Sequence, residues 1–271
     1  MSSPLSQFDL YIEPSPRRVR VEFGGEVIAQ TQNALLVHER GHLPVYYFPA
    51  DSVRTELLRT ADQKTQCARK GEASYWHIDA GGRHAANAVW RYASPSTEAG
   101  EALKDYYAFE WKAVDAWFEE EEELFQHPHA RDPYKRVDAI SSSRHVKVWI
   151  DDEVIAESSN AVVVFETGLP TRYYLPLQDV RSRLLVPSAR LTTCPYKGQA
   201  RYWSAKIGDK LHEDVVWSYP TPIREIPKIA GLLSFYQERV TRFEVDGKPV
   251  GEEAWHRSVL DFFNHGSFYR S

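Results

Sequence analysis

The feature that most constrains the fold is an internal repeat, because the chain aligns with itself when it is shifted by 127 residues. EVIA at 26–29 falls on EVIA at 153–156. TQCARKGEASYW at 65–76 falls on TTCPYKGQARYW at 192–203. No gap is needed from residue 17 to residue 98 of the first copy. A long ungapped match indicates two copies of one domain and excludes a solenoid of short repeats.

The repeat predicts two domains, which is also what 271 residues suggest at about 100–200 residues per domain. We expect a first repeat domain at 1–125, a linker at 126–143 and a second repeat domain at 144–271. The linker segment is rich in Pro, His and Ser and ends where the second copy begins. Each copy is long enough to bury a core of its own.

Alternating apolar and polar residues predict half-buried β-strands at 18–23 (RVRVEF) and 145–150 (HVKVWI). GGE at 24–26 and DDE at 151–153 follow these strands, where tight hairpin turns are expected. Other apolar segments are rich in β-branched and aromatic residues, which are typical of strands. The predicted fold is mainly β with minor α content. It consists of two tandem domains, each a small antiparallel sheet domain with one or two short helices.

Three segments have helical spacing. SVRTELLRT at 52–60 and DVRSRLLVP at 179–187 each start with a capping residue and predict a short helix. The segment at 99–125 has the apolar spacing of one amphipathic helix. Its counterpart in the second copy is more typical of a helix followed by a strand. We therefore expect helix to about Phe109 and strand from about Val114.

Composition narrows the expected partners. The net charge of −5 provides no basic surface for nucleic acid, so no nucleic-acid partner is expected. The sequence has no run of about 18 apolar residues, so no membrane span is expected, and its start lacks a secretion signal. Two cysteines do not make a disulfide scaffold, so the expected location is cytoplasmic. Because the tandem could replace a homodimer of single domains, we expect a monomer or a loose dimer.

Three chemically active residues of the second copy are the predicted catalytic residues. Cys194 could act as a nucleophile beside the cation of Lys197, or it could be a small buried apolar residue. Lys197 could bind an anion or act as a base, or it could be a solvated turn lysine. Glu166 ends an apolar strand, where it could act as a general base or pair with Arg144 of the neighbouring strand. The counterparts in the first copy are Cys67, Lys70, Glu39 and Arg17.

Aromatic residues make up 13% of the chain, and a set of them recurs in both copies. Core packing is one interpretation, and the wall of a ligand pocket with tyrosine hydroxyls as polar contacts is the other. The predicted ligand-binding residues of the second copy are Arg144, Tyr174, Trp203, Trp217 and Tyr219. Those of the first copy are Arg17, Glu39, Tyr47, Lys70, Trp90 and Tyr92.

The sequence offers no adequate metal site and no cofactor motif. No CxxC pair is present, so zinc lacks a suitable set of ligands. The glutamates at 119–123 are poor ligands, because neighbours in a strand point to opposite faces, and we expect them at a solvated edge or turn. No glycine-rich phosphate loop, GxSxG or HExxH occurs. We therefore expect no metal and no cofactor.

The motifs TTCPYKGQARYW at 192–203 and VVWSYPTP at 215–222 resemble the family named domain of unknown function 427, in its tandem form. The resemblance covers about 17–250 and implies a small, metal-free β domain similar to the β-tent group. It names no established reaction. The first copy departs from the motif, with CARKG in place of CPYKG, so the resemblance favours activity in the second copy. The implied recurring positions are Arg144, Glu166, Tyr174, Cys194, Lys197, Trp217 and Tyr219.

Three functions fit these residues. The first is a metal-free, cofactor-independent enzyme of hydrolase, isomerase or lyase type, which acts on a small polar or aromatic molecule in an aromatic-walled pocket. The second is a non-catalytic module with two small-ligand sites. The third is a structural role, in which the repeated polar residues would be buried pairs.

Overall fold

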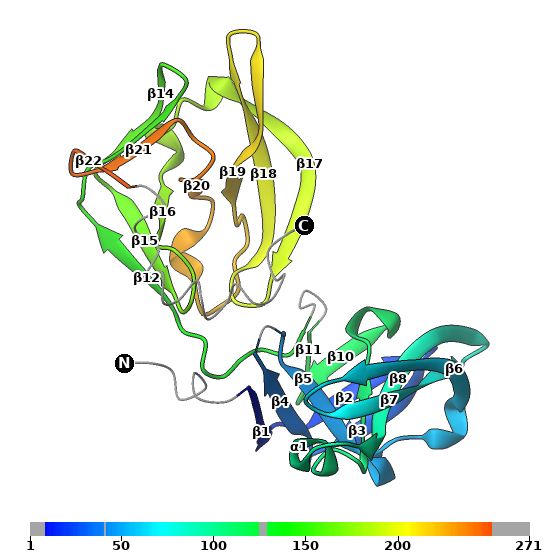
Figure 1. Cartoon of the computed structure of the whole chain (residues 1–271). Helices are drawn as coiled ribbons and strands as arrows, with labels where there is room; N and C mark the ends of the chain where they lie inside the picture. The colour runs from blue at the N-terminus through cyan, green and yellow to red at the C-terminus, as the bar shows by residue number, and fades with distance from the viewer. Residues whose placement is uncertain (1–8, 41, 125–128, 251–271) are drawn as a thin grey trace. The chain divides into compact units, whose positions relative to one another are not determined.

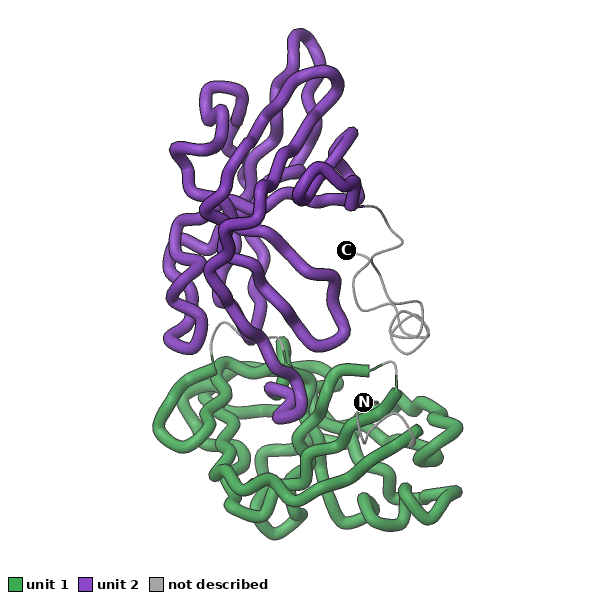
Figure 2. Tube along the Cα trace, turned by 90° about the vertical axis from the view of Figure 1, so that its left-hand side faces the viewer, with its two compact units in different colours: residues 1–130, 265–271 green, residues 131–264 purple. Residues whose placement is uncertain are grey.

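The computed structural model describes residues 9–40, 42–124 and 129–250. Among these residues the chain divides into two compact units, of which unit 1 ends at Ala130 and unit 2 begins at Arg131 (Figure 2). The division falls within the segment 126–143 that the sequence suggests as a linker.

Each unit contains a seven-stranded and a four-stranded sheet, and neighbouring strands are antiparallel throughout (Figure 1). The larger sheet of unit 1 has, in spatial order, β1 (Leu10–Pro14), β4 (Leu35–Glu39), β5 (Val45–Pro49), β9 (Tyr106–Phe109), β8 (Arg83–Pro95), β7 (Gly71–Ala80) and β6 (Leu58–Cys67). Its smaller sheet has β11 (Glu122–Glu123), β10 (Ala116–Glu119), β2 (Val19–Phe23) and β3 (Glu26–Thr31).

Unit 2 repeats this topology strand for strand, as the internal repeat requires. Its larger sheet has, in spatial order, β12 (Val137–Ser142), β15 (Ala161–Glu166), β16 (Arg172–Leu175), β20 (Leu233–Phe235), β19 (Lys210–Ser218), β18 (Gly198–Ile207) and β17 (Leu185–Cys194). Its smaller sheet has β14 (Glu153–Ser158), β13 (Val146–Ile150), β21 (Arg242–Val245) and β22 (Lys248–Pro249). The prediction of two tandem, mainly β domains is confirmed.

The expected hairpins form at the predicted turns. β2 pairs with β3 through Gly24 and Gly25, whose φ angles are +63° and +79°. β13 pairs with β14 through a turn in which Asp151 has a φ of +50°. Glycine and aspartate tolerate this left-handed backbone, so the turn residues agree with the structure.

The larger sheet of unit 1 is apolar on both faces. One face packs against the smaller sheet, and Val21 of β2, Phe48 of β5 and Phe109 of β9 belong to the one buried cluster between them. The opposite face carries a second cluster that includes Tyr47 and Tyr92. Successive side chains of a strand point to opposite faces, so Phe48 and Tyr47 serve different cores. The second face is where the candidate site lies.

Each unit has short helical segments, as predicted, but these are shorter than the sequence indicates and are mostly 3-10 turns. The segment at 52–60 contains the last residue of η2, the whole of η3 and the start of β6, and 179–187 contains the last residue of η5, the whole of η6 and the start of β17. Helix α1 of the 99–125 segment is only four residues long, and the strand β9 occupies 106–109, where helix was predicted. β9 pairs with β5 and β8 and completes the sheet, which outweighs the helical periodicity. The bounds are η2 (Ala50–Ser52), η3 (Thr55–Leu57), α1 (Glu98–Glu101), η4 (Trp111–Ala113), η5 (Leu177–Asp179), η6 (Ser182–Leu184) and η7 (Pro227–Ile229).

Part of the predicted linker is regular structure. Residues 137–142 form β12, which pairs with β15 over six residue positions from Val137↔Glu166 to Ser142↔Ala161. The equivalent strand of unit 1 is β1, which pairs with β4. Hydrogen bonding to a neighbouring strand makes this segment part of unit 2, although its Ser-rich composition suggests a loop.

Within the described ranges, no helix combines the length and the apolar character that crossing a bilayer would require.

Candidate functional site

The repeated Cys-x-x-Lys-Gly segment forms a tight turn in both units. In unit 1 it joins β6 to β7, and the Lys70 N–H donates to the Cys67 carbonyl over 3.3 Å. Gly71 has a φ of +106°, and a Cβ there would lie 2.8 Å from the backbone nitrogen of Ser96. Glycine is therefore required both by the backbone angle and by the close approach of the next strand. The turn directs the lysine onto the sheet face.

Glu39 is the centre of the polar cluster in unit 1. Its carboxylate accepts hydrogen bonds from Lys70 Nζ over 2.6 Å and from Arg69 over 3.1 Å. The Cys67 thiol donates to the same carboxylate over 3.6 Å. The side chains of Glu39 and Lys70 are each 9% exposed, so most of this ion pair is removed from water. The glutamate, thiol and lysine predicted from the repeat do converge in unit 1.

The charges of this cluster are stabilised by their neighbours. Burial acts to raise the pKa of Glu39, but the hydrogen bonds and charges of Lys70 and Arg69 outweigh it and lower the pKa. Burial acts to lower the pKa of Lys70, but Tyr92 and Glu39 outweigh it and raise the pKa. Lys70 is therefore an ammonium ion, and the alternative of a lysine base with a depressed pKa is wrong for it.

Aromatic side chains surround the ion pair. Trp90 Nε1 donates to the Tyr47 hydroxyl over 3.4 Å, with the two rings perpendicular. Lys70 Nζ lies 5.2 Å from the centre of the Tyr92 ring, within range of a cation–π contact. Burial raises the pKa of Tyr47 and of Tyr92, so both phenols are neutral. Tyr47, Trp90 and Tyr92 of the first copy therefore pack together beside the Glu39–Lys70 pair.

A cavity of about 460 Å³ opens beside this cluster in unit 1. Its volume falls within the range of about 300–1,000 Å³ typical of small-molecule sites. Its aromatic lining comes from β5, β7 and β8, and its charged lining comes from β4, the turn after β6 and Glu110, which follows β9. The residues that line it include Glu39, His42, Tyr47, Cys67, Ala68, Arg69, Lys70, Tyr75, Trp90, Tyr92 and Glu110.

The counterpart in unit 2 has the same inner ion pair. Lys197 Nζ donates to Glu166, and both side chains are less than 10% exposed. Burial acts to raise the pKa of Glu166, but the charges of Lys197 and Lys135 outweigh it and lower the pKa. The pKa of Lys197 is raised by the Cys194 and Glu166 side chains against the effect of burial. The predicted catalytic residues of the second copy therefore lie together, with Lys197 as a cation.

The aromatic residues of unit 2 also match those of unit 1. Trp217 Nε1 donates to the Tyr174 hydroxyl over 3.1 Å, and burial raises the pKa of Tyr174 to about 12. Tyr219 packs in the same cluster, with its ring centre 6.4 Å from that of Tyr174. Each of these three predicted ligand-binding residues is less than 10% exposed, as are Tyr47 and Tyr92 of unit 1.

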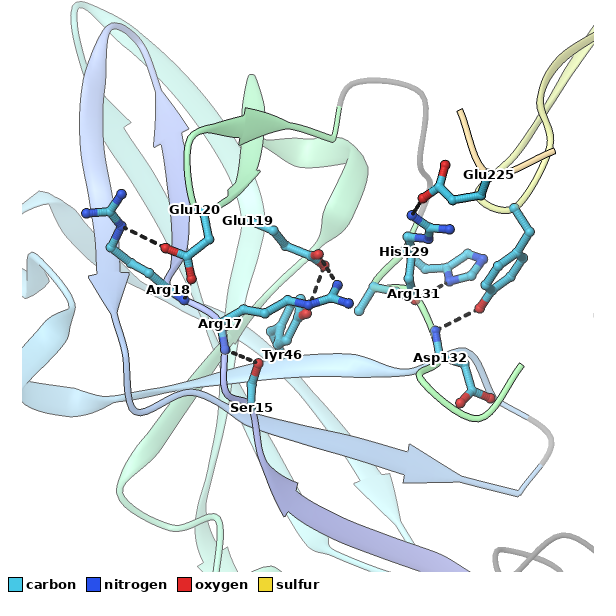
Figure 3. Close-up of polar contacts among 12 residues, drawn as sticks. Ser15, Arg17, Arg18, Tyr46, Glu119, Glu120, His129, Arg131, Asp132 and Glu225 are labelled. Carbon is cyan, nitrogen blue, oxygen red and sulfur yellow. Dashed lines mark hydrogen bonds and ion pairs between the residues drawn. The ribbon is translucent and has the colours of Figure 1, made fainter. Parts of the chain in front are cut away.

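The segment 131–136, which we call the strap, lies over the unit 2 cluster. Lys135 Nζ lies 3.0 Å from the second oxygen of Glu166 and 5.0 Å from the centre of the Tyr196 ring. The Asp132 N–H donates to the Tyr196 hydroxyl over 2.7 Å, and Arg131 pairs with Glu225 over 2.7 Å (Figure 3). The ammonium group of Lys135 therefore pairs with the second oxygen of Glu166.

The predicted ligand-binding arginines, Arg17 and Arg144, do not lie at the Glu39 and Glu166 clusters. Glu39 and Glu166 do not pair with Arg17 and Arg144, because those arginines lie in the segments just before β2 and β13 of the smaller sheets and bond other partners there. Arg17 instead bonds Glu119, which also accepts a hydrogen bond from the Tyr46 hydroxyl over 2.9 Å (Figure 3).

Arg144 donates to Asp246 over 2.8 Å and to the Tyr173 hydroxyl over 3.4 Å. Neither arginine therefore approaches the cavity or its counterpart. The prediction that 119–123 is solvated holds only in part, since Glu119 is buried whereas Glu122 and Glu123 are exposed.

The prediction that Trp203 binds a ligand at this site is also wrong. It packs against the core between the two sheets of unit 2, whereas Tyr202 before it joins the cluster of Tyr174 and Trp217. Adjacent residues of a strand point to opposite faces, so Tyr202 and Trp203 cannot both line one site. The register agrees, because Tyr202 pairs with Trp217 and Trp203 pairs with Val216.

Sequence reasoning missed the residue that most distinguishes the two sites. Arg69 supplies the second cation to Glu39 in unit 1, and Tyr196 occupies the same repeat position in unit 2. There the second cation is Lys135, from the predicted linker. The sequence difference between CARKG at 67–71 and CPYKG at 194–198 could have pointed to Arg69. From the sequence it indicated only that the first copy departs from the family motif.

The arrangement can hold a polar ligand and can move a proton between groups, but it has no ligand set for a metal. Within 9–40, 42–124 and 129–250, no group of three or more His, Cys, Asp or Glu side chains could hold a metal ion. The cavity lining provides two carboxylates, a thiol, two cations, an imidazole and several aromatic rings.

Two antiparallel β units in tandem, each with a Glu–Lys pair on the outer face of its larger sheet, define the class of this chain. The chain belongs to the family described as domain of unknown function (DUF427), which matches residues 11–120 and 138–246. No curated protein matches the chain.

Proposed function

We propose that unit 1 binds a small polar or aromatic molecule in its cavity, on the face of the larger sheet that carries Glu39 and Lys70. The observation that carries this proposal is a cavity of about 460 Å³ at which aromatic rings and a buried ion pair meet. Ligand sites commonly combine apolar and aromatic walls with a few polar groups that orient the ligand.

The difference between the two units supports a site in unit 1. In unit 2 the second oxygen of Glu166 is held by Lys135 of the strap. In unit 1 the equivalent contact comes from Arg69, whose side chain is 35% exposed and lines the cavity. We therefore assign ligand binding to the first copy, although its motif departs further from the family pattern.

The experiment is a binding screen with the full chain and a panel of planar compounds, namely indole, nicotinamide, benzamide and benzoate, observed by NMR. Ala68 is exposed and lines the cavity, so Ala68→Trp should fill it and weaken binding by at least about tenfold. Ala93→Trp is the matched control, because Ala93 is exposed on β8 and does not line the cavity. The proposal fails if no compound binds, or if Ala68→Trp binds as the wild-type chain does.

A second candidate function is catalysis, favoured by the 3.6 Å contact between the Cys67 thiol and Glu39. In such a step the sulfur would form a bond to the carbonyl carbon of an activated ester, and the carbonyl π electrons would move to oxygen. Glu39 would accept the thiol proton and return it to the leaving oxygen as the intermediate collapses, which releases the alcohol and leaves the acyl group on sulfur as a thioester. Water would then hydrolyse the thioester to the free acid and restore the thiol. The predicted catalytic residues Glu166, Cys194 and Lys197 would do the same in unit 2.

Turnover of p-nitrophenyl acetate by Cys67→Ala and Cys194→Ala variants separates these alternatives. Loss of activity in Cys67→Ala alone assigns the chemistry to unit 1, and loss in Cys194→Ala alone assigns it to unit 2. Equal rates in both variants and in the wild-type chain reject cysteine catalysis and leave binding as the function.

A cytoplasmic location remains part of the proposal. Cys67 and Cys194 are both free thiols, and reduced thiols suit a reducing compartment.

A further inference from the structure

The guanidinium of Arg69 has hydrogen-bond donors in the unit 1 cavity beyond the one that bonds Glu39. One terminal nitrogen of its guanidinium donates to Glu39 over 3.1 Å. Its Nε and second terminal nitrogen have no partner within the described residues, and the side chain is 35% exposed at the cavity. These two nitrogens form the edge of a guanidinium that binds a planar oxyanion through two parallel hydrogen bonds.

The charges at this end of the cavity favour an anion. Lys70 and Arg69 contribute two positive charges, and Glu39 contributes one negative charge between them. His42 also lines the cavity, and it lies near enough to Glu39 to lower the pKa of that carboxyl. Glu110 is the other carboxylate of the lining and is exposed to solvent, which screens its charge.

The rings beside Arg69 suit a flat molecule. Tyr75 and Trp90 line the cavity and are only partly buried, so their faces are available to a ligand. The Tyr75 hydroxyl is held by Thr65 over 3.0 Å, and Trp90 is held by Tyr47, so both rings are fixed before binding.

We propose that the cavity of unit 1 takes small planar molecules that carry a carboxylate, and that Arg69 binds this carboxylate through its Nε and its second terminal nitrogen. The inference rests on the proposed function and adds the class of ligand to it. In unit 2 the same repeat position is Tyr196, which cannot provide a cationic fork. The ligand class is therefore a property of unit 1.

The test compares three probes of similar size, each built on one benzene ring, on the full chain: benzoate, benzamide and benzylammonium. A charge-assisted pair of hydrogen bonds should make benzoate bind at least about tenfold more tightly than benzamide, and benzylammonium should bind most weakly. Arg69→Gln should remove the preference for benzoate without preventing benzamide from binding. Arg59→Gln is the matched control, because Arg59 is exposed on β6 outside the cavity and should leave the order unchanged.

Three results would overturn the inference: equal affinity for the three probes, an unaltered preference for benzoate in Arg69→Gln, or the absence of benzoate binding. If benzamide or indole still binds and Ala68→Trp still blocks it, the proposed function stands and only the ligand class is wrong. If no planar compound binds the wild-type chain, both proposals fail.

Discussion

Glu166 and Glu39 each sit between two cations, although the second cation comes from different parts of the chain. Glu166 is paired with Lys197 and Lys135, and Glu39 is paired with Lys70 and Arg69. A buried carboxylate is costly unless it is paired and hydrogen-bonded, so the repeat preserves the charge pattern while the partners change. The residue types of the repeat are therefore explained first by electrostatics within each unit.

We expect Glu166→Gln to destabilise unit 2 by about 3–5 kcal/mol, because it leaves the buried Lys197 ammonium without a carboxylate. Denaturant unfolding of the full chain, followed by NMR signals of unit 2, measures this loss. Glu157→Gln is the control, because Glu157 is nearly half exposed and pairs with His145 and Lys147 at the surface. That substitution should cost under about 1 kcal/mol. Equal losses in both variants would contradict the buried-pair argument.

The ionisation of Glu166 also predicts that the stability of unit 2 depends on pH. The folded pKa of Glu166 lies below its ordinary value of 4.5, so folding favours the ionised form. The resulting stability is fully present above pH 4.5 and is lost as the pH falls through the lower folded value. Unit 2 of the wild-type chain should therefore lose stability in this acid range more steeply than unit 2 of Glu166→Gln. Parallel pH profiles of the two unfolding midpoints would refute this.

At the scale of elements, the turn between β6 and β7 and the turn between β17 and β18 determine where the lysines point. Both glycines that follow the lysines have φ angles near +105°, at +106° for Gly71 and +104° for Gly198. Gly71 lies closer to the adjacent backbone, since a Cβ at Gly198 would lie 3.3 Å from the Thr221 oxygen. The sequence predicted a turn at these positions from the residue types, but it could not predict the close approach of the neighbouring strand.

Gly71→Ala is expected to lower the stability of unit 1 by about 2 kcal/mol or more, because backbone strain and a close contact add together. Gly25→Ala is the matched control, since Gly25 has a φ of +79° and no atom within 4 Å of a built Cβ. It should show only the cost of the backbone angle, about 1–2 kcal/mol. Thermal unfolding followed by signals of unit 1 compares the two. A smaller loss for Gly71→Ala than for Gly25→Ala would contradict the packing argument.

At the scale of the whole molecule, two units of the same topology have acquired different surroundings for the same ion pair. Unit 1 has a cavity beside Glu39 and Lys70, and unit 2 has the strap over Glu166. A duplicated fold does not imply a duplicated function, because function depends on the groups that surround the site.

We therefore expect one small ligand per chain, bound in unit 1, because Lys135 already holds the second oxygen of Glu166. Isothermal titration of the full chain with the tightest compound of the panel measures the ratio directly. Lys135→Ala should leave the affinity of the unit 1 site unchanged, since Lys135 belongs to unit 2. A ratio of two ligands per wild-type chain would show that the strap does not close the second site.

The sequence alone determined the duplication, the antiparallel β character and the recurrence of glutamate, thiol, lysine and aromatic residues. These depend on local alternation and on repeated residue types, which are visible without coordinates. Only the tertiary structure decided which residues share a face. Trp203 points away from the site because neighbouring residues of a strand alternate and the sheet separates two cores. Arg17 lies in the bend before β2, where it bonds Glu119. The tertiary structure also decided that Arg69 and Lys135 complete the two sites, since each unit draws its second cation from a different segment.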